Sequence, residues 1–199
     1  MNDFLHIINN SGREEIINIK EFNFHPLLKD IENIFWLFIL SNKALSLPET
    51  QNILKVDNNF FGILHKYNEW TNLKIEKNKN SLVYTSKLNV QKQMILLGKA
   101  MAIITYDFIL ASKYNSSINN DEEFQFLRYV RNGAAHYNTF NIKDENGKWK
   151  LEEGENIRWD SKNINRKVHG KKVFPFFVSI FDMFLLAKDL SNKLIKIDN

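Results

Sequence analysis

Residues 120–140, NDEEFQFLRYVRNGAAHYNTF, carry the pattern that decides the fold of this chain. Asn120 followed by Glu123 resembles a capping box at the start of a helix. At about 100° per residue, apolar and small side chains then cover one arc of the helix and polar side chains the opposite arc. The apolar arc holds Leu127, Val130, Gly133, Ala134 and Tyr137, and the polar arc holds Arg128, Arg131, Asn132 and His136. The stretch predicts an amphipathic helix that runs towards Phe140.

Apolar residues recur with the helical period in further segments. Pro26 suits the first turn of a helix over residues 26–45, and the period returns over residues 173–195. Another helix is expected from Asp57, and a long one from a cap at Asn89. The predicted inner face of the long helix is Met94, Leu97, Met101, Ile104, Phe108 and Ala111. With 3 Pro and 7 Gly in the chain, we expect a mainly α fold, an up-down bundle of about four to five helices in a single domain over residues 1–199.

Two segments favour β structure instead. Residues 4–22 alternate around a turn cluster at residues 9–12, which predicts an N-terminal β-hairpin. Residues 141–172 lose the helical period and contain Asn146-Gly147, a turn signal. We expect short strands at residues 148–151 and 156–159. The predicted bundle is therefore interrupted by a small β-rich insertion over residues 141–172.

The composition excludes several classes of chemistry. The chain has no Cys, which rules out disulfides, thiolate metal sites and cysteine nucleophiles. No histidine pair shows metal-ligand spacing, so neither a metal nor another cofactor is expected. The first residues lack a secretory signal pattern. The apolar runs at residues 34–40 and 173–187 are too short, or interrupted by Pro175 and Asp182, to span a membrane. We expect a cytoplasmic protein without membrane contact.

Positive charge is concentrated in the second half of the insertion. The chain carries a net charge of +4, and residues 161–172 contain basic side chains and no acidic one. These basic residues are Lys162, Arg166, Lys167, Lys171 and Lys172. Such a patch is typical of contacts with RNA phosphates, although a solvated loop explains the charge equally well.

The polar arc of residues 120–140 holds the groups that metal-free RNA cleavage needs. On a helix, Arg131 and His136 lie about 140° apart around the axis and about 7.5 Å apart along it, and an arginine is long enough to reach across. Histidine can act as base or acid near neutral pH, and arginine can hold two phosphate oxygens. Asn132 can orient the imidazole or bind phosphate. The small residues 133–135 leave space beside the histidine, and two chains facing each other would supply two histidines.

This Arg-Asn-x-x-x-His motif, placed near the head of the predicted helix, resembles the motif of the HEPN superfamily, in which a histidine follows an arginine after four to six residues. The resemblance covers residues 26–140 and the last helix. It implies a dimeric helical bundle with both motifs in one cleft, and a metal-independent endoribonuclease of toxin–antitoxin, abortive-infection or CRISPR-linked defence systems. By this resemblance Arg131, Asn132 and His136 are catalytic and Arg128 is a supporting residue. RNA, a second copy of the chain, and an antitoxin or defence-system protein are the implied partners.

Several of these residues also have a non-catalytic or structural explanation. Arg131 and His136 are also compatible with a non-catalytic scaffold, or with a subunit that binds RNA or a nucleotide without cutting it. Asp182, inside an apolar helix, needs a partner: either an arginine such as Arg128 or Arg131, or the dimer interface. His25 fits turn chemistry, and His65 a helical core. His169, in the basic segment, is a minor candidate for phosphate contact.

Overall fold

The computed structural model describes residues 4–8, 12–18, 23–46, 48 and 81–199, and it is mainly helical. The chain divides into two compact units, residues 1–33 with 92–199, and residues 34–91. The candidate residues all belong to the first unit, apart from His65. The helix expected from Asp57, and with it His65, lies outside the described residues.

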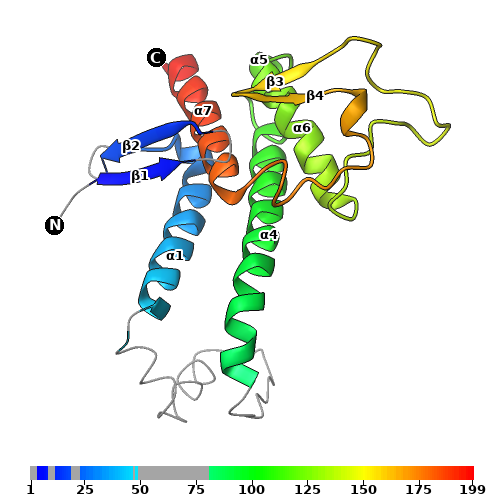
Figure 1. Ribbon diagram of the computed structural model, residues 1–199. Coiled ribbons are helices and arrows are strands. Elements are labelled where there is room, and N and C mark those ends of the chain that lie inside the picture. The colour runs from blue at the N-terminus through cyan, green and yellow to red at the C-terminus, as the bar shows by residue number, and fades with distance from the viewer. Residues whose placement is uncertain (1–3, 9–11, 19–22, 47, 49–80) are drawn as a thin grey trace, which may run out of the picture. The chain divides into compact units, whose positions relative to one another are not determined.

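The predicted N-terminal hairpin is confirmed. β1 (Phe4–Ile8) pairs antiparallel with β2 (Glu14–Asn18), with Phe4 opposite Asn18 (Figure 1). Just before β2, Arg13 donates two hydrogen bonds to Asp189, at 2.8 and 3.0 Å. This bidentate pair ties the hairpin to α7 (Ile180–Asp198).

The predicted helix after Pro26 is also confirmed. A short 3-10 turn, η1 (Pro26–Leu28), leads directly into α1 (Lys29–Ser46). Pro26 occupies the first helical turn, where its missing N–H costs no hydrogen bond, and the His25 ring accepts one from the Leu27 amide. Leu28 and Ile31 are fully buried. The start signal in the sequence therefore worked because proline and cap fall where a helix leaves backbone donors unpaired.

The long helix exists, but its start and its buried face were predicted wrongly. α4 (Ser81–Leu110) begins before Asn89, so that residue lies inside the helix. Met101 is buried as predicted, whereas Phe108 is 36% exposed. The buried face is rotated towards Gly98, where an added Cβ would lie 2.7 Å from the Phe174 ring. The close approach of the Phe174 ring to Gly98 determines which face of α4 is buried. The apolar periodicity of the sequence does not reveal this contact. The buried positions of α4 in the described range are Gly98, Met101, Ala102, Thr105, Tyr106 and Ile109.

Within α4, the segment Lys92–Leu110 is long and apolar enough to cross a membrane by length and composition, and 28% of it is buried. Core helices of soluble proteins meet the same criterion, so it does not distinguish a membrane-spanning helix from such a core helix. Much of the rest of this segment presents apolar side chains to the surface, including Leu96 and Leu110. The cytoplasmic location stays a prediction.

The motif helix is shorter than predicted. After the single turn α5 (Asn115–Ile118), α6 runs from Glu122 to Ala135, and its cap residue Asp121 makes no side-chain cap bond. The expected capping box is wrong because the Glu123 carboxylate instead accepts a hydrogen bond from Lys193 on α7 at 2.6 Å. The apolar arc is confirmed for its helical members, which are Leu127, Val130, Gly133 and Ala134, all buried.

The insertion contains one small sheet. β3 (Ile157–Trp159) pairs antiparallel with β4 (Lys162–Ile164), and the 3-10 turn η2 (Arg166–Val168) follows. The strand predicted at residues 156–159 is thus confirmed, whereas residues 148–151 form no strand and Trp149 makes only an isolated bridge to Lys143. Trp159 is buried against Phe126 of α6, with ring centroids 5.6 Å apart, so the insertion shares the core of the helices.

The last helix begins later than the apolar pattern suggested. α7 starts at Ile180, after residues 173–179 that form turns with a cis Phe174-Pro175 bond. Ser179 caps it: its side chain accepts from the Asp182 amide, and the Asp182 carboxylate accepts from the Ser179 amide at 2.7 Å. Most of α7 is buried within its own chain, including Met183, Leu186 and Leu190.

Candidate functional site

Arg131, Asn132 and His136 lie at the C-terminal end of α6, not at its head. Ala135 is the last helical residue, and His136 is the cap, with φ −105° and ψ 79°. Its amide donates to the Asn132 carbonyl at 3.0 Å. Because His136 has left the helical conformation, the helical geometry expected between Arg131 and His136 is wrong. The imidazole is instead exposed where the chain turns away from the helix.

The turn after His136 is built from two residues in the left-handed region, Tyr137 (φ 57°) and Asn138 (φ 59°). Asn138 donates its amide to the Phe174 carbonyl at 2.7 Å and accepts from the Phe174 amide at 3.0 Å. The Val173 amide also donates to the Asn138 carbonyl at 3.1 Å. Three hydrogen bonds therefore fix the turn beside His136 against the segment that leads into α7.

Arg131 is half-buried and only partly paired. Its Nη2 donates to Asp107 of α4 at 3.3 Å, and its guanidinium lies 5.3 Å from the Tyr106 ring centre. Its Nε is buried without a hydrogen-bond partner among the described residues. The buried Nε is out of reach of a ligand, but the side chain is 30% exposed and each Nη makes only one bond among the described residues, so the Nη groups keep donor capacity for an anion. Neither Asp107 nor Tyr106 was expected at the site from the sequence, because α4 lies far from α6 along the chain.

Asn132 joins the other two motif residues. Its side-chain oxygen accepts from Arg131 Nη1 at 3.4 Å, and its backbone carbonyl accepts from the His136 amide. The three residues thus form one connected group, although the Asn132 side chain contacts Arg131 and not the imidazole. The space expected beside the small residues is filled by the chain itself: a Cβ on Gly133 would lie 2.5 Å from Val173 Cγ2.

Arg128, the expected supporting residue, contacts the segment that joins α5 to α6. It donates to Asn119 at 2.7 Å and to Gln125 at 3.3 Å. These bonds hold the connection between α5 and α6. Among the described residues, Arg128 makes no hydrogen bond or ion pair with Arg131 or His136.

One lysine of the basic segment reaches the motif. Lys172 Nζ donates to the Thr139 hydroxyl at 3.0 Å and to the Tyr137 carbonyl at 3.3 Å. Lys171 is exposed beside it, and its carbonyl accepts from the Phe140 amide. The basic segment therefore returns to the turn that follows His136, and it adds positive charge there.

Lys162 is not available for RNA. Its Nζ lies 3.4 Å from Asp182 Oδ1, and the two side chains are 9% and 0% exposed. Asp182 also accepts from the Ser179 hydroxyl at 2.8 Å. The partner of Asp182 is therefore Lys162 and not the arginine that we had predicted. The predicted contact between Lys162 and RNA is also wrong, because Lys162 and Asp182 neutralise each other in the interior.

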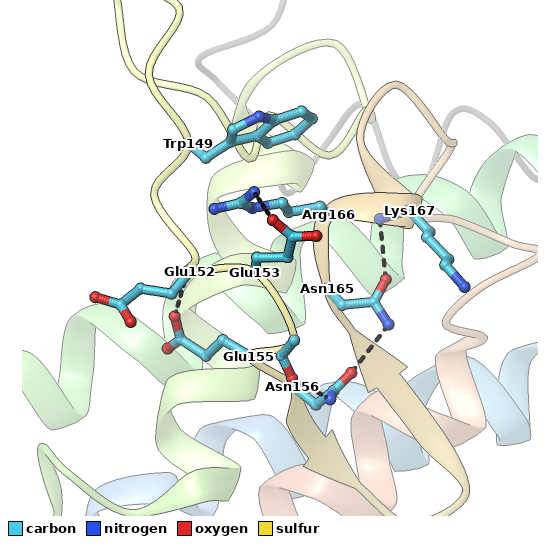
Figure 2. A pocket seen from close by; sticks show the side chains of 9 residues that line it. Trp149, Glu152, Glu153, Glu155, Asn156, Asn165, Arg166 and Lys167 are labelled. Atoms are coloured by element: carbon cyan, nitrogen blue, oxygen red, sulfur yellow. Dashed lines mark hydrogen bonds and ion pairs between the residues drawn. The ribbon is translucent and has the colours of Figure 1, made fainter.

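Arg166 and Lys167 line a separate pocket of about 460 Å³. Figure 2 shows the Arg166 side chain beneath Trp149, with Glu153 beside the guanidinium and Glu152 and Glu155 further from the indole ring. Arg166 lies 5.3 Å from the Trp149 ring, donates to the Leu151 carbonyl at 2.9 Å and reaches Glu153 at 4.0 Å. The lining includes Glu152, Glu153, Glu155, Asn156 and Asn165. Acidic groups thus offset part of the basic charge, so this pocket is a poorer phosphate site than the turn near Lys172.

His25 and His169 have structural contacts. His25 is buried, and its Nε2 lies 2.9 Å from Asp198. His169 accepts from the Ile142 amide at 3.2 Å and packs edge-on to Trp149. Within residues 4–8, 12–18, 23–46, 48 and 81–199, no three His, Asp or Glu side chains gather as metal ligands would.

Comparison of the chain with protein-family models, curated proteins and solved structures gives no match.

Proposed function

We propose that this protein is a metal-independent endoribonuclease of the HEPN type, a toxin or defence effector that cuts RNA at a site shared between two copies of the chain. The observation that carries the proposal is the connected group at the end of α6. There the partly exposed Arg131 keeps donor capacity on its Nη groups, Asn132 contacts both Arg131 and the His136 amide, and His136 is exposed. The group combines a proton carrier with a phosphate ligand at one surface.

The chemistry follows from these groups. His136 of one copy takes the proton from the ribose 2′-hydroxyl as that oxygen attacks phosphorus. The P–O5′ bond breaks, and His136 of the second copy gives a proton to the departing 5′-oxygen. Arg131 stabilises the additional negative charge on the phosphorane. The products are a 2′,3′-cyclic phosphate and a 5′-hydroxyl, and neither water nor metal takes part.

An apolar stripe on α4 supports the shared site. Leu96, Ile103 and Leu110 are spaced by seven residues and so lie on one face of the helix. Leu96 is 65% and Leu110 is 44% exposed. Asp107, the partner of Arg131, falls on the same face. A second copy bound to this stripe completes a helical bundle next to Arg131. Most of α7, by contrast, is buried inside the chain.

A second candidate is a non-catalytic HEPN-like scaffold, or a subunit that binds RNA or a nucleotide. The Arg131–Asp107 ion pair favours it, since an arginine neutralised by its own chain is less available to phosphate. Such a subunit would act through a partner protein from the same toxin–antitoxin or defence system.

Cleavage by the purified protein separates the two candidates. The wild type should cut single-stranded RNA in the presence of EDTA, leave 2′,3′-cyclic phosphate ends and spare DNA. His136→Ala should abolish cleavage without a change in circular dichroism, because the side chain is exposed. His169→Gln, a histidine change outside the site, serves as the control. A folded wild-type dimer that leaves every RNA intact supports the scaffold.

A further inference from the structure

Tyr137 combines an unfavourable backbone conformation with an exposed aromatic side chain. It has φ 57°, in the left-handed region, which carries a steric cost for a residue other than glycine. Its side chain is 92% exposed, so packing does not compensate for that cost. Glycine or asparagine would fit this backbone better, and the next residue is indeed Asn138. Local conflicts of this kind are expected at functional positions.

The surrounding hydrogen bonds hold Tyr137 in this position. The Asn138 side chain is bonded to both backbone groups of Phe174, and the Tyr137 carbonyl accepts from Lys172. The phenol ring is thus carried by a fixed turn directly after His136, and the backbone carbonyl of Tyr137 itself contacts the Lys172 ammonium group.

A second exposed aromatic ring lies on the segment that is hydrogen-bonded to Asn138 and leads into α7. Phe176 is 78% exposed and follows Phe174 by two residues. The backbone segments that carry the two rings meet at the Asn138–Phe174 hydrogen bonds, next to Tyr137 and two residues before Phe176. Exposed Lys171 and the Lys172 ammonium supply positive charge there. Two exposed rings among cations fit the bases and phosphates of a single strand.

We propose that Tyr137 and Phe176 are base-stacking residues that hold single-stranded RNA across the end of α6. The proposal rests on the function given above, since the strand they hold would be the one cut at Arg131 and His136. Duplex RNA, whose bases are already stacked and paired, is the poorer ligand for such a surface.

Binding can be measured apart from cleavage with a 2′-O-methyl RNA of about 12 nucleotides, a length that such platforms cover. This probe lacks the attacking hydroxyl, so the wild type binds it without cutting it. Tyr137→Ala and Phe176→Ala should each weaken binding roughly 5- to 150-fold. Tyr137→Phe and Tyr137→Trp should bind nearly as well as the wild type.

An abasic version of the probe isolates stacking. With phosphates kept and bases removed, Tyr137→Ala should have no further effect on affinity. Tyr137→Ala should also leave the salt dependence of binding unchanged, whereas Lys171→Ser should reduce it, because only the lysine releases counterions. Equal losses on the normal and abasic probes would overturn the proposal.

Tyr137→Gly distinguishes a ligand contact from a structural role. Glycine adopts the left-handed conformation without strain, so the unfolding midpoint should equal or exceed that of the wild type while RNA binding falls as for alanine. A lower midpoint would show that the ring supports the fold. Loss of the dimer in sedimentation would identify the ring as a contact between copies. Either result rejects RNA stacking.

Failure of this proposal is distinguishable from failure of the proposed function. Cleavage that persists unchanged in Tyr137→Ala and Phe176→Ala leaves the nuclease standing and removes the stacking role. RNA binding that depends on Tyr137, without cleavage of any RNA, would support the stacking role and contradict the nuclease.

Discussion

Asp107 on α4 accepts a hydrogen bond from Arg131 on α6 at 3.3 Å, and this contact sets the resting position of the guanidinium in the proposed site. The side chains are 47% and 30% exposed, respectively, so solvent screens the pair. A phosphate arriving at Arg131 would compete with a carboxylate that is held only by this single bond.

Asp107→Asn should therefore raise RNA affinity. An exposed pair of this kind contributes up to about 1 kcal/mol, so the gain should reach about fivefold at most. Fluorescence anisotropy with 2′-O-methyl RNA measures it. Asp30→Asn, which removes the same charge from an exposed site on α1, is the control. A fall in affinity would mean that Asp107 positions Arg131 for RNA.

The basic residues should separate into two groups. Lys162→Ser leaves the Asp182 charge buried and should destabilise the protein by about 3–5 kcal/mol. Lys167→Ser and Lys171→Ser change exposed side chains and should leave the unfolding free energy nearly unaltered. If the segment binds RNA, the latter pair should also weaken binding and flatten its salt dependence. Urea unfolding and binding titrations report the two effects; equal stability of all three variants would contradict the buried pair.

Stability should fall in acid through Asp198. Hydrogen bonds from His25, and then from Tyr114, hold the pKa of this carboxyl at about 2, below the ordinary 3.8, with Lys113 adding its charge. A depressed carboxyl pKa stabilises the folded state above the unfolded value, and the gain is lost as pH falls from about 4 through 2. The difference in melting temperature between wild type and Asp198→Asn should therefore shrink over that window. Glu145→Gln, an exposed carboxylate, controls for general charge effects.

Gly133→Ala should destabilise the end of α6. The new methyl group would meet Val173 at 2.5 Å and the Thr139 carbonyl at 3.3 Å. Overpacking of this kind costs about 1–3 kcal/mol, more than the gain in helix propensity of up to about 1 kcal/mol. Adding Val173→Ala should relieve the clash, and a double-mutant cycle in urea measures the coupling. Simple additivity would show that the two positions are not packed together.

Dimerisation should depend on the α4 stripe. Sedimentation at micromolar concentration should give twice the chain mass of 23.5 kDa. Leu96→Glu places a charge in the exposed stripe and should shift the protein towards monomer. Ile16→Glu, at an equally exposed residue of the N-terminal hairpin (69%), should have no effect. A wild-type monomer would remove the shared site.

Local signals in the sequence were sufficient where a single segment decides its own structure. Pro26 and its helix, and the pairing of residues 4–8 with residues 14–18, are of this kind. Ser179-x-x-Asp182 before an apolar run is also a helix-start signature, and it would have corrected the start of α7. The end of α6 was missed because the helical period continues to Tyr137 and no glycine or proline marks the stop. Asn138 was the available signal, since asparagine tolerates the left-handed conformation.

The remaining errors come from tertiary contacts. Lys162 looked like a phosphate ligand because charge alone does not show that the β3–β4 hairpin points it at Asp182. Arg128 and Arg131 have the same side chain, yet one is bound to Asn119 and the other faces Asp107. Only the packing of α4 and α5 against α6 separates the two roles.

The insertion leaves and rejoins the helices at one point. The Phe140 amide donates to Lys171, the Gly170 amide donates back to Phe140, and Val173 donates to Asn138. Its buried residues Ile142 and Ile157 lie on either side of a mostly exposed outer span, residues 143–156. Because these hydrogen bonds close the base of the insertion, the Asn146-Gly147 turn should tolerate an inserted sequence. A genetically encoded fluorophore placed there should report on the protein without disturbing the end of α6.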